Sequence, residues 1–379
     1  MSFPQSVMIV AGEASADMHG AGLIRALKEK RPDLAICGMG GSELAATGVE
    51  ILYDASLVSV VGLVEVLSHL RHIHRAMKIL KIRLKKAKPS LVILLDLPDF
   101  NLRLAAYAKK LGIPVLYYIS PQIWAWRTGR VKKIARLVDR MAVILPFEEE
   151  FYRKQGMQVD FVGHPLVDSI NDHLGRHGEV LFPSFSDKIK IGIMPGSRRK
   201  ELSALLAVFF ETCRLLTKRL TNLEFYLFCA PGVESASLQT QIPEDLKGNF
   251  FVIEKDRYDF MRQCAAVIVA SGTATLELAL LNTPMVVAYR MAPLTFWLAS
   301  KLVKVPFVSL VNLVAGYQVV PELLQERVTA KGLTDEVLPL LSDSQERKGM
   351  LEGFTLLRQK LGEGGASGRA AKIALDMIG

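Results

Sequence analysis

The chain has 379 residues, half of them apolar and only 8% aromatic. This length exceeds what one hydrophobic core usually supports, and an aliphatic composition is typical of parallel α/β sheets, so we expect two domains of that class. The net charge of +9 belongs mainly to the first half, since residues 1–170 carry 23 Lys and Arg against 16 Asp and Glu, whereas the remainder carries 24 against 22.

Cysteine usage and hydropathy exclude several classes of protein. The four cysteines lie far apart, without a CxxC pair or metal-ligand spacing; they are Cys37, Cys213, Cys229 and Cys264. This favours reduced, buried thiols in a cytoplasmic protein and predicts no metal site. The first residues lack a basic region and a long apolar run, so we expect no signal peptide, and no stretch of about 20 uncharged apolar residues predicts a membrane span.

The chain opens with strand, small-residue turn and helix, and then repeats this pattern. An apolar run at 7–11 leads into Gly12, Glu13, Ser15 and Asp17, and a second run at 34–37 leads into a glycine-rich turn. This is the opening of a Rossmann-like sheet. Neither turn matches G-x-G-x-x-G, so the sequence does not support a dinucleotide fingerprint.

Residues 57–88 combine an apolar part with a basic part. Apolar residues crowd positions 60–70, and residues 71–88 then contain eight Lys or Arg and no acid. One interpretation is a buried helix followed by a solvated basic helix. The other is an interfacial segment that touches lipid with its apolar side and anionic headgroups with its basic side.

A buried strand at 91–95 is followed by two candidate carboxylates. Asp96 comes directly after five apolar residues. Functional groups gather beyond the carboxyl ends of strands in open α/β sheets, so Asp96 is a candidate general base. Asp99 or Asn101 suits the N-cap of the following helix better.

The strand at 115–119 runs into Ser-Pro-Gln-Ile-Trp-Ala-Trp-Arg. Trp124 and Trp126 could line a sugar or acyl pocket, although packing of a helix onto the sheet is the better interpretation. His164 precedes a proline and is predicted to be structural. The polar, turn-rich segment 171–188 is interpreted as the linker between the domains.

The second half begins a new alternation of strands and helices. The strand at 189–194 ends in Gly196, Ser197 and Arg198, directly before a helix. Such a turn favours an anion, and the planar guanidinium of arginine suits a diphosphate because it bonds two oxygens at once.

A second phosphate-type turn lies between the predicted strands at 267–270 and 285–289. It contains Ser271, Gly272 and Thr273, and Glu277 sits in the first turn of the helix that follows. Glu277 either offsets the helix dipole or accepts hydrogen bonds from ribose hydroxyls. Further on, Asn312 is placed in a turn, and the last 30 residues are predicted to hold an amphipathic helix, a flexible glycine-rich break and a short tail.

Two Rossmann-like domains that face each other across a cleft describe the GT-B glycosyltransferase architecture. We predict an N-terminal acceptor domain at 1–170 and a C-terminal donor domain at 188–349, with a C-terminal helix at about 350–379 able to pack back on the first. A kinase or an epimerase could share this layout.

Ten ordered motifs across nearly the whole length resemble the lipid-A-disaccharide synthase family, glycosyltransferases of outer-membrane biogenesis. They are GEASADMHGAGL (12–23), VGLVEVL (61–67), DLPDFN (96–101), SPQIWAWR (120–127), LPFE (145–148), VGHPL (162–166), PGSRRKEL (195–202), ASGTATLE (270–277), PMVVAYRM (284–291) and SLVNLVAG (309–316). The resemblance implies an inverting transfer that joins UDP-2,3-diacylglucosamine to 2,3-diacylglucosamine 1-phosphate. The products are a β-1,6-linked disaccharide 1-phosphate and UDP.

The resemblance also implies roles for the candidate residues. Asp96 would be the base, Arg198 and the turns at Gly196–Ser197 and Ser271–Thr273 would stabilise the leaving UDP without a metal or cofactor, and Glu277 would hold the ribose. Asn312 would lie near the diphosphate or the transferred sugar. Glu13, Ser15 and Asp17 would line the acceptor side. A cytoplasmic enzyme, peripherally bound to the inner membrane, is expected, and a homodimer is left open.

The chain departs from the family pattern at two places. Ala16 stands where the family usually has glycine, and a left-handed backbone there would cost roughly 1 kcal/mol or more. Tyr317 and Gln318 occupy positions expected to be basic, which weakens a phosphate role there.

Two rival functions remain at this stage. One is a different UDP-sugar transferase, such as the peptidoglycan N-acetylglucosaminyltransferase, or an epimerase of the same fold. The other is a non-enzymatic basic module that binds membrane or nucleic acid. Aromatic residues are too sparse in the basic runs for single-strand stacking, so we expect no nucleic acid partner.

Overall fold

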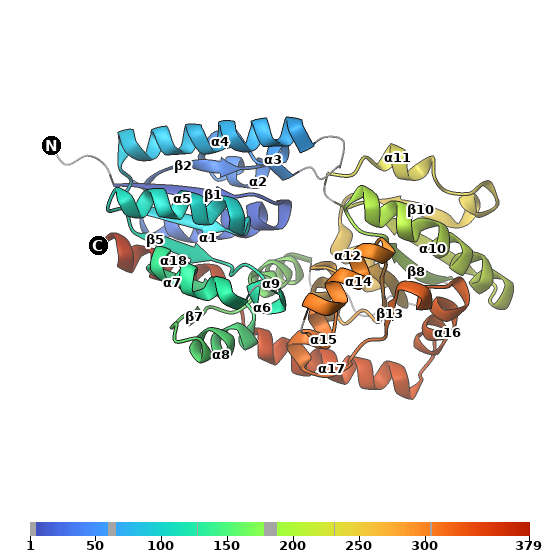
Figure 1. Cartoon of the computed structure of the whole chain (residues 1–379). Helices are drawn as coiled ribbons and strands as arrows, with labels where there is room; N and C mark the ends of the chain where they lie inside the picture. Colours follow the sequence, from blue (N-terminus) through green and yellow to red (C-terminus); the bar gives the residue numbers. More distant parts are fainter. Residues whose placement is uncertain (1–4, 60–65, 127, 178–187, 231, 304) are drawn as a thin grey trace. The chain divides into compact units, whose positions relative to one another are not determined.

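A computed structural model describes residues 5–59, 66–126, 128–177, 188–230, 232–303 and 305–379. The chain forms two compact units, one of Met1–Asp168 with Gly364–Gly379 and one of Ser169–Glu363. Each unit contains one parallel β-sheet with helices packed on it (Figure 1).

The first unit is built on a seven-stranded sheet in the order β3-β2-β1-β4-β5-β6-β7. Its strands are β1 (Ser6–Ala11), β2 (Ala35–Gly40), β3 (Glu50–Asp54), β4 (Leu91–Leu95), β5 (Val115–Tyr118), β6 (Arg140–Val143) and β7 (Asp160–Phe161). The order reverses between β1 and β4, which pair with Ala11 opposite Leu95. In such a sheet the crevice for ligands opens at this reversal, beyond the carboxyl ends of the strands.

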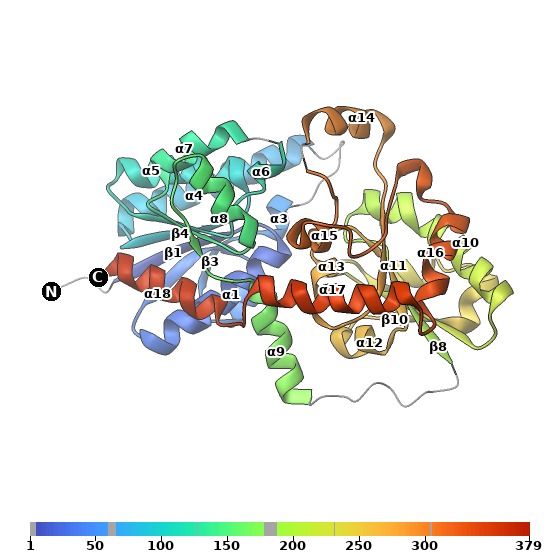
Figure 2. The ribbon, with the colours of Figure 1, turned by 90° about the horizontal axis from the view of Figure 1, so that it is seen from below.

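Helices cover both faces of this first sheet (Figure 2). Those of the unit are α1 (Ala14–Lys30), α2 (Ser42–Ala46), α3 (Ser56–Ser59), α4 (Val66–Ala87), α5 (Pro98–Lys110), α6 (Ile123–Trp126), η1 (Thr128–Arg130), α7 (Val131–Leu137), α8 (Pro146–Lys154) and α18 (Ala366–Ile378). α1 and α18 pack together on one face, and α4, α5 and α7 follow one another on the other.

The second unit is built on a six-stranded sheet in the order β10-β9-β8-β11-β12-β13. Its strands are β8 (Ile189–Met194), β9 (Leu223–Phe228), β10 (Phe250–Ile253), β11 (Ala266–Ala270), β12 (Met285–Tyr289) and β13 (Glu322–Leu324). The order reverses between β8 and β11, where Met194 lies opposite Val269. Both sheets thus have the strand order of a Rossmann fold, which confirms the predicted class.

The helices of the second unit pack on both sides of its sheet. They are α10 (Arg199–Arg219), α11 (Ser235–Gln239), η2 (Glu244–Asn249), α12 (Arg257–Gln263), α13 (Ala274–Leu280), α14 (Pro293–Leu302), α15 (Leu310–Ala315), η3 (Gln325–Arg327), α16 (Ala330–Leu340) and α17 (Gln345–Leu361). α10 packs on α16, and α13 packs on α15 and α17. α9 (Pro165–His177) contains the boundary between the units.

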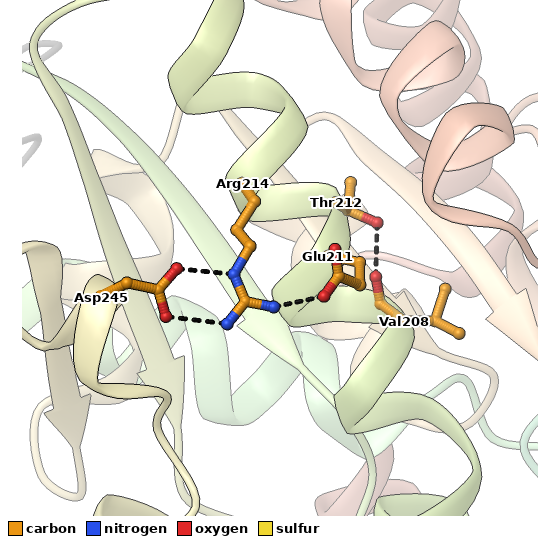
Figure 3. A network of polar contacts seen from close by, with 5 residues as sticks. All are labelled: Val208, Glu211, Thr212, Arg214 and Asp245. Atoms are coloured by element: carbon orange, nitrogen blue, oxygen red, sulfur yellow. Dashed lines mark hydrogen bonds and ion pairs between the residues drawn. The ribbon is translucent and has the colours of Figure 1, made fainter.

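A charged contact fastens the long helix α10 to the η2 turn (Figure 3). Arg214 donates two hydrogen bonds to the carboxylate of Asp245, at 2.6 and 2.8 Å, and also pairs with Glu211 one turn back on its own helix. A planar guanidinium bonding both oxygens of one carboxylate fixes geometry better than a single contact does. The contact joins α10, whose N-cap residue is Arg198, to the η2 turn at the surface.

Two predictions about irregular segments are wrong. Residues 171–177 of the predicted linker continue α9, and its side chains Asn171 and His173 pair with Arg358 (3.1 Å) and Asp259 (2.8 Å) of the second unit. The rest of that segment, 178–187, lies outside the described residues. The predicted short tail is the helix α18, with Ala370, Ala371 and Ala374 fully buried.

All four cysteines are free and buried, as predicted. Within the part of the chain that the structure describes, none of the helices combines the length and apolarity needed to cross a bilayer.

Candidate active site

The turn that follows β4 holds Asp96 in an unusual backbone conformation. Asp96 (φ +50°) and Leu97 (φ +41°) are both left-handed; aspartate tolerates this conformation, whereas for Leu97 it costs roughly 1–2 kcal/mol. Asn101 Nδ2 and the Tyr117 hydroxyl donate to the Asp96 carbonyl at 2.6 and 2.5 Å, and Asn101 also donates to the Leu95 carbonyl at 2.9 Å. The surrounding bonds therefore hold the half-buried Asp96 at the sheet reversal.

The predicted N-cap roles of Asp99 and Asn101 are wrong. Leu97 occupies the N-cap position of α5, and a leucine side chain has no oxygen to accept a capping hydrogen bond. Asn101 is instead fully buried beneath the turn, where it fixes Asp96. Asp99 is exposed and pairs with Arg130 at 2.6 Å.

The turn after β1 packs directly on the Asp96 turn. A Cβ on Gly12 would lie 1.6 Å from Leu97 Cδ1, so only glycine lets the two turns approach this closely. Glu13 then precedes α1, and Ser15 lies in its first turn; both are half-buried. The structure thus brings Glu13 and Asp96 to the same reversal in the first sheet.

Asp17 is placed within the fold. It is 5% exposed, and its carboxylate accepts hydrogen bonds from the backbone of Gly41 (2.6 Å), Glu43 (2.9 Å) and Leu44 (3.4 Å). A carboxylate at a helix N-terminus stabilises unpaired amides, so Asp17 fastens α1 to α2. The expected strain at Ala16 is absent, because Ala16 lies inside α1, where alanine is the best helix former.

Two histidines of the sequence motifs meet in the interior of the first unit. The rings of His19 and His164 lie edge to face, with centroids 6.0 Å apart. Burial lowers the pKa of His19 to about 4 and the pKa of His164 to about 3, so both are neutral at pH 7. His164 Nδ1 accepts the Leu166 amide at 3.2 Å, which agrees with the predicted structural role.

Trp124 and Glu148, from two other motifs, form a second interior contact. Trp124 Nε1 donates to Glu148 Oε1 at 3.1 Å, and the Leu145 amide donates to Glu148 Oε2 at 3.1 Å. Burial raises the pKa of Glu148 to about 7, against the hydrogen bonds that lower it. Trp124 therefore packs α6 onto the fold, and the side chain of Trp126 lies outside the described set.

In the second unit, the turn after β8 binds a carboxylate of its own helix. The amides of Ser197 and Arg198 donate to Glu201 Oε2 at 3.1 and 3.2 Å. Gly196 has φ +103°, and a Cβ there would lie 2.3 Å from the same oxygen. The guanidinium of Arg198 is 65% exposed and lies 3.5 Å from Glu201 Oε1. Arg198 is thus tethered at the mouth of the turn while its charge faces solvent.

The turn after β11 lies beside that one, because β8 and β11 are neighbours. Its Ser271 hydroxyl donates to the Val308 carbonyl at 2.9 Å, and Thr275 donates to the Gly272 carbonyl at 2.8 Å. The backbone of Gly272 and Thr273 leads straight into α13. The two turns singled out in the sequence therefore meet at the reversal of the second sheet.

Glu277 is a buried carboxylate in the first turn of α13. Its side chain is 10% exposed and lies 3.7 Å from Arg257 Nη2, and the Tyr258 hydroxyl donates to it at 3.4 Å. Burial raises the pKa of Glu277, whereas Arg257 and then Tyr258 lower it. Both partners come from α12, which no sequence signal had linked to this site.

The side chain of Asn312 is buried, and all of its hydrogen-bonding positions are used within the fold. Its amide donates to the Val320 carbonyl (2.9 Å) and Glu322 Oε1 (2.8 Å) and accepts from the amides of Val319 (2.7 Å) and Val320 (3.0 Å). These four bonds saturate an asparagine side chain.

The same Glu322 accepts the amides of Val308 and Ser309, each at 2.9 Å. Asn312 and Glu322 thus fix the segment that the Ser271 hydroxyl contacts.

Sequence reasoning missed Glu201, Arg257 and Glu322. Glu201 stands three residues after Arg198, a spacing typical of a capped helix start, so this contact could have been predicted. Arg257 and Glu322 reach their partners across 20 and 10 or more residues of chain, and no local spacing reveals such contacts. Among the described residues, no group of three or more His, Cys, Asp or Glu side chains could hold a metal ion.

Comparisons with known proteins assign the chain to a family. A family model described as lipid-A-disaccharide synthetase matches residues 7–374. The lipid-A-disaccharide synthase of Geobacter metallireducens is 45% identical over 376 residues, which cover 98% of this chain and 97% of that protein.

Two solved structures share the fold at low identity. A glycosyltransferase of kitacinnamycin has a TM-score of 0.67 at 16% identity and covers 99% of both chains. A UDP-N-acetylglucosamine 2-epimerase from Listeria monocytogenes has a TM-score of 0.62 at 15% identity and covers 98% of this chain and 95% of that one. The GT-B fold alone is therefore shared by transferases and epimerases, and the family match separates them.

Proposed function

The chain belongs to the lipid-A-disaccharide synthase family, and we propose that Asp96 is the general base of its transfer reaction. The reaction joins UDP-2,3-diacylglucosamine to 2,3-diacylglucosamine 1-phosphate and releases UDP. The oxygen of the acceptor's 6-hydroxyl forms a bond to the anomeric carbon of the donor sugar. Its proton passes to Asp96 while the bond from that carbon to the diphosphate breaks, which inverts the configuration.

The backbone of Asp96 is the observation that supports this role best. The Asp96 turn includes the strained, left-handed Leu97; such residues persist only where their surroundings hold them, and they cluster at functional sites. Asn101 and Tyr117 supply that hold through the backbone carbonyl. The carboxylate can thus keep one orientation toward an acceptor hydroxyl, as a general base requires.

We assign the donor nucleotide to the paired turns of the second unit. Arg198 would neutralise the charge that develops on the diphosphate, since its guanidinium is exposed at the start of α10. The diphosphate would compete with Glu201 for the Ser197 and Arg198 amides, beside Gly196. Ser271–Thr273 would line the neighbouring turn.

Glu277 would accept hydrogen bonds from the ribose hydroxyls. Asn312 would act indirectly, because its own bonds are saturated and it positions the segment around Ser309. On the acceptor side, Glu13 and Ser15 would contact the monosaccharide. Asp17 would hold that turn in place from within.

The Asp96 assignment is tested by Asp96→Asn. Asparagine tolerates a left-handed backbone and keeps the side-chain shape, but it cannot take up the proton. We expect kcat to fall by about 10²–10⁴-fold while the Kd for UDP stays within about twofold. Asp99→Asn is the matched control and should keep nearly full activity, because Asp99 is exposed and pairs with Arg130 at the surface. Loss of turnover in the control alone would show that the wrong aspartate had been chosen.

We also propose that α4 binds the anionic surface of the cytoplasmic leaflet of the inner membrane, since both substrates carry acyl chains. Ala76, Leu80 and Leu84 anchor α4 to its own sheet and are fully buried. Its outer side exposes Leu70 (50%) and Ile82 (57%) among basic residues.

α14 in the second unit offers Trp297, which is 55% exposed and has Lys301 Nζ 3.8 Å from its ring centroid. Positions 60–65 of the predicted interfacial segment lie outside the described residues.

Liposome sedimentation tests the membrane proposal. Binding should be strong on vesicles containing phosphatidylglycerol, weak on neutral ones, and reduced by salt, since each basic residue near an anionic surface contributes about 1 kcal/mol. Leu70→Ser with Ile82→Ser should weaken binding without lowering the Tm. Leu356→Ser, at a side chain 51% exposed on α17, is the control. Undiminished binding in the double variant would place the membrane contact elsewhere.

A further inference from the structure

Glu277 is paired with two side chains of α12 that the proposed function does not use. Arg257 Nη2 lies 3.7 Å from Glu277 Oε2, and the Tyr258 hydroxyl donates to Oε1 at 3.4 Å. The two contacts reach different oxygens of the carboxylate. Arg257 itself is only 23% exposed, and its Nε is buried without a hydrogen-bond partner among the described residues.

Burial creates a problem for a carboxylate that must accept hydrogen bonds. When ionised, a carboxyl group offers only acceptors and can receive both hydroxyls of a ribose; when protonated, it becomes a donor on one oxygen. Removal from water favours the protonated form, and a nearby cation favours the ionised form. At Glu277 both influences are present, and burial is the larger of the two.

We propose that Arg257, assisted by Tyr258, is a positioning residue that keeps Glu277 ionised and aimed at a ribose, and thereby sets a preference for ribonucleotides over deoxyribonucleotides. This inference rests on the proposed ribose role of Glu277. It gives α12 a role in specificity. Arg257 and Tyr258 would act through Glu277 and would not contact the ligand themselves.

The other groups around Glu277 leave Arg257 as its principal cation. On α17, which packs on α13, Arg358 donates to the Leu280 carbonyl at the far end of the helix. On α9, His173 pairs with Asp259 at 2.8 Å and contacts the ring of Tyr258. The sequences of α15 and β11 contain no ionisable residue, and β12 contributes Tyr289 alone.

The test measures, for the full chain, the ratio of the Kd for 2′-deoxy-UDP to the Kd for UDP. It covers about pH 5.5 to 8.5, the range in which carboxyl groups titrate when burial has raised their pKa. Both nucleotides carry the same diphosphate, so the ratio cancels its titration. The wild type should favour UDP by about tenfold at the upper end of this range, the loss expected for one hydrogen bond to a charged group, and should keep more of this preference on acidification than a variant without the cation.

Arg257→Met should make this preference depend more strongly on pH. Without the cation the pKa of Glu277 rises further, so the preference should survive at the upper end and shrink toward unity as the pH falls. Arg257→Lys keeps the charge and should restore the wild-type profile. Tyr258→Phe should give a smaller shift in the same direction, and Glu277→Gln, which cannot titrate, should show a reduced preference that does not depend on pH.

Three results would overturn the inference. If Arg257→Met weakens both nucleotides by one factor at every pH, Arg257 binds the ligand itself or only supports the fold. If the lysine variant behaves as the methionine variant does, charge is not what Arg257 supplies. If the wild type shows no preference for UDP, the ribose assignment of Glu277 fails, and the inference fails with it.

Discussion

Asp96 and Asp99 stand three residues apart in different surroundings. Asp96 closes β4 in a left-handed turn whose carbonyl is held by two side chains. Asp99 lies on the outer surface of α5, with a side chain 71% exposed, and forms an ion pair of a kind that contributes about 0–1 kcal/mol. Their environments, rather than their residue type, separate a candidate base from a surface charge.

Arg198→Ala should lower kcat/KM by about 10²–10³-fold, the usual effect of removing one donor that stabilises developing charge. Arg198→Lys should recover only part of this, because an ammonium cannot bond two oxygens in a plane. Steady-state kinetics on both variants measure the change in kcat/KM. Lys200→Ala, at an exposed position two residues on, is the control. Wild-type rates in Arg198→Ala would remove Arg198 from the donor site.

Glu148 should make the stability of the first unit depend on pH. Its folded-state pKa of about 7 lies above the usual 4.5, so the folded state retains a proton that the unfolded state has released between those values. The stability it contributes is therefore present below about pH 4.5 and is lost as the pH rises toward 7, with a limiting slope of about 1.4 kcal/mol per pH unit.

Urea unfolding of wild type and Glu148→Gln across that interval measures this contribution. The glutamine cannot titrate, so the difference in free energy of unfolding between the two proteins should change with pH and level off above about 7. A difference that stays constant from about pH 5 to 8 would show that Glu148 does not titrate there.

At the scale of single residues, the sequence predicted which turns carry polar groups but not how each group is used. Asp96, Arg198 and Glu277 could be placed because a polar residue after a buried strand falls at the edge of a parallel sheet. Asn312 could not be distinguished from a ligand-binding residue, because the four hydrogen bonds of its side chain include one to Glu322, ten residues further on. Hydrogen-bond saturation is a property of the folded surroundings.

Among the elements, α9 and α18 are joined by one carboxylate. Asp168 on α9 accepts the amides of Gly365, Ala366 and Ser367, which are the first amides of α18. It acts as an N-cap supplied from another helix, where a negative charge also offsets the helix dipole. The docking of α18 onto α1 brings Ser367 against Gly22, where a Cβ would lie 2.9 Å from the Ser367 hydroxyl.

Asp168→Ala should reduce stability by about 1–2 kcal/mol and expose α18 to hydrogen exchange. Exchange at 366–378 should accelerate while that of α17 stays unchanged. Asp376→Ala, at an exposed position on α18, should stay within about 0.5 kcal/mol of wild type. Equal exchange in the Asp168 variant and the wild type would mean that packing alone holds the helix.

Strands were easier to predict than helix ends. Each central strand is a short run of apolar residues, buried on both faces, and such runs stand out in a sequence. Residues 171–177 and α18 were missed because their polar or glycine-flanked sequences resemble linkers. What makes them helical is contact with distant parts of the chain, including the Asp168 cap.

At the scale of the whole molecule, the two units have the same strand order. In each sheet, two turns lie side by side where this order reverses. Alternating strands and helices predicted two Rossmann-like sheets. The strand order itself could not be read from the sequence, whereas a C-terminal helix able to pack back on the first domain was expected, and residues 364–379 do belong to the first unit. Strand order depends on pairing between distant segments. The proposed transfer reaction would use the reversal of the first sheet for the base and the reversal of the second sheet for the nucleotide.

Mass spectrometry of the products is the measurement that tests this account most directly. The full chain is supplied with UDP-2,3-diacylglucosamine and 2,3-diacylglucosamine 1-phosphate. The wild type should form a tetraacylated disaccharide 1-phosphate and UDP in equal amounts, and Asp96→Asn should form both about 10²–10⁴-fold more slowly. UDP without disaccharide, or an isomerised UDP-sugar with the acceptor unconsumed, would contradict this account.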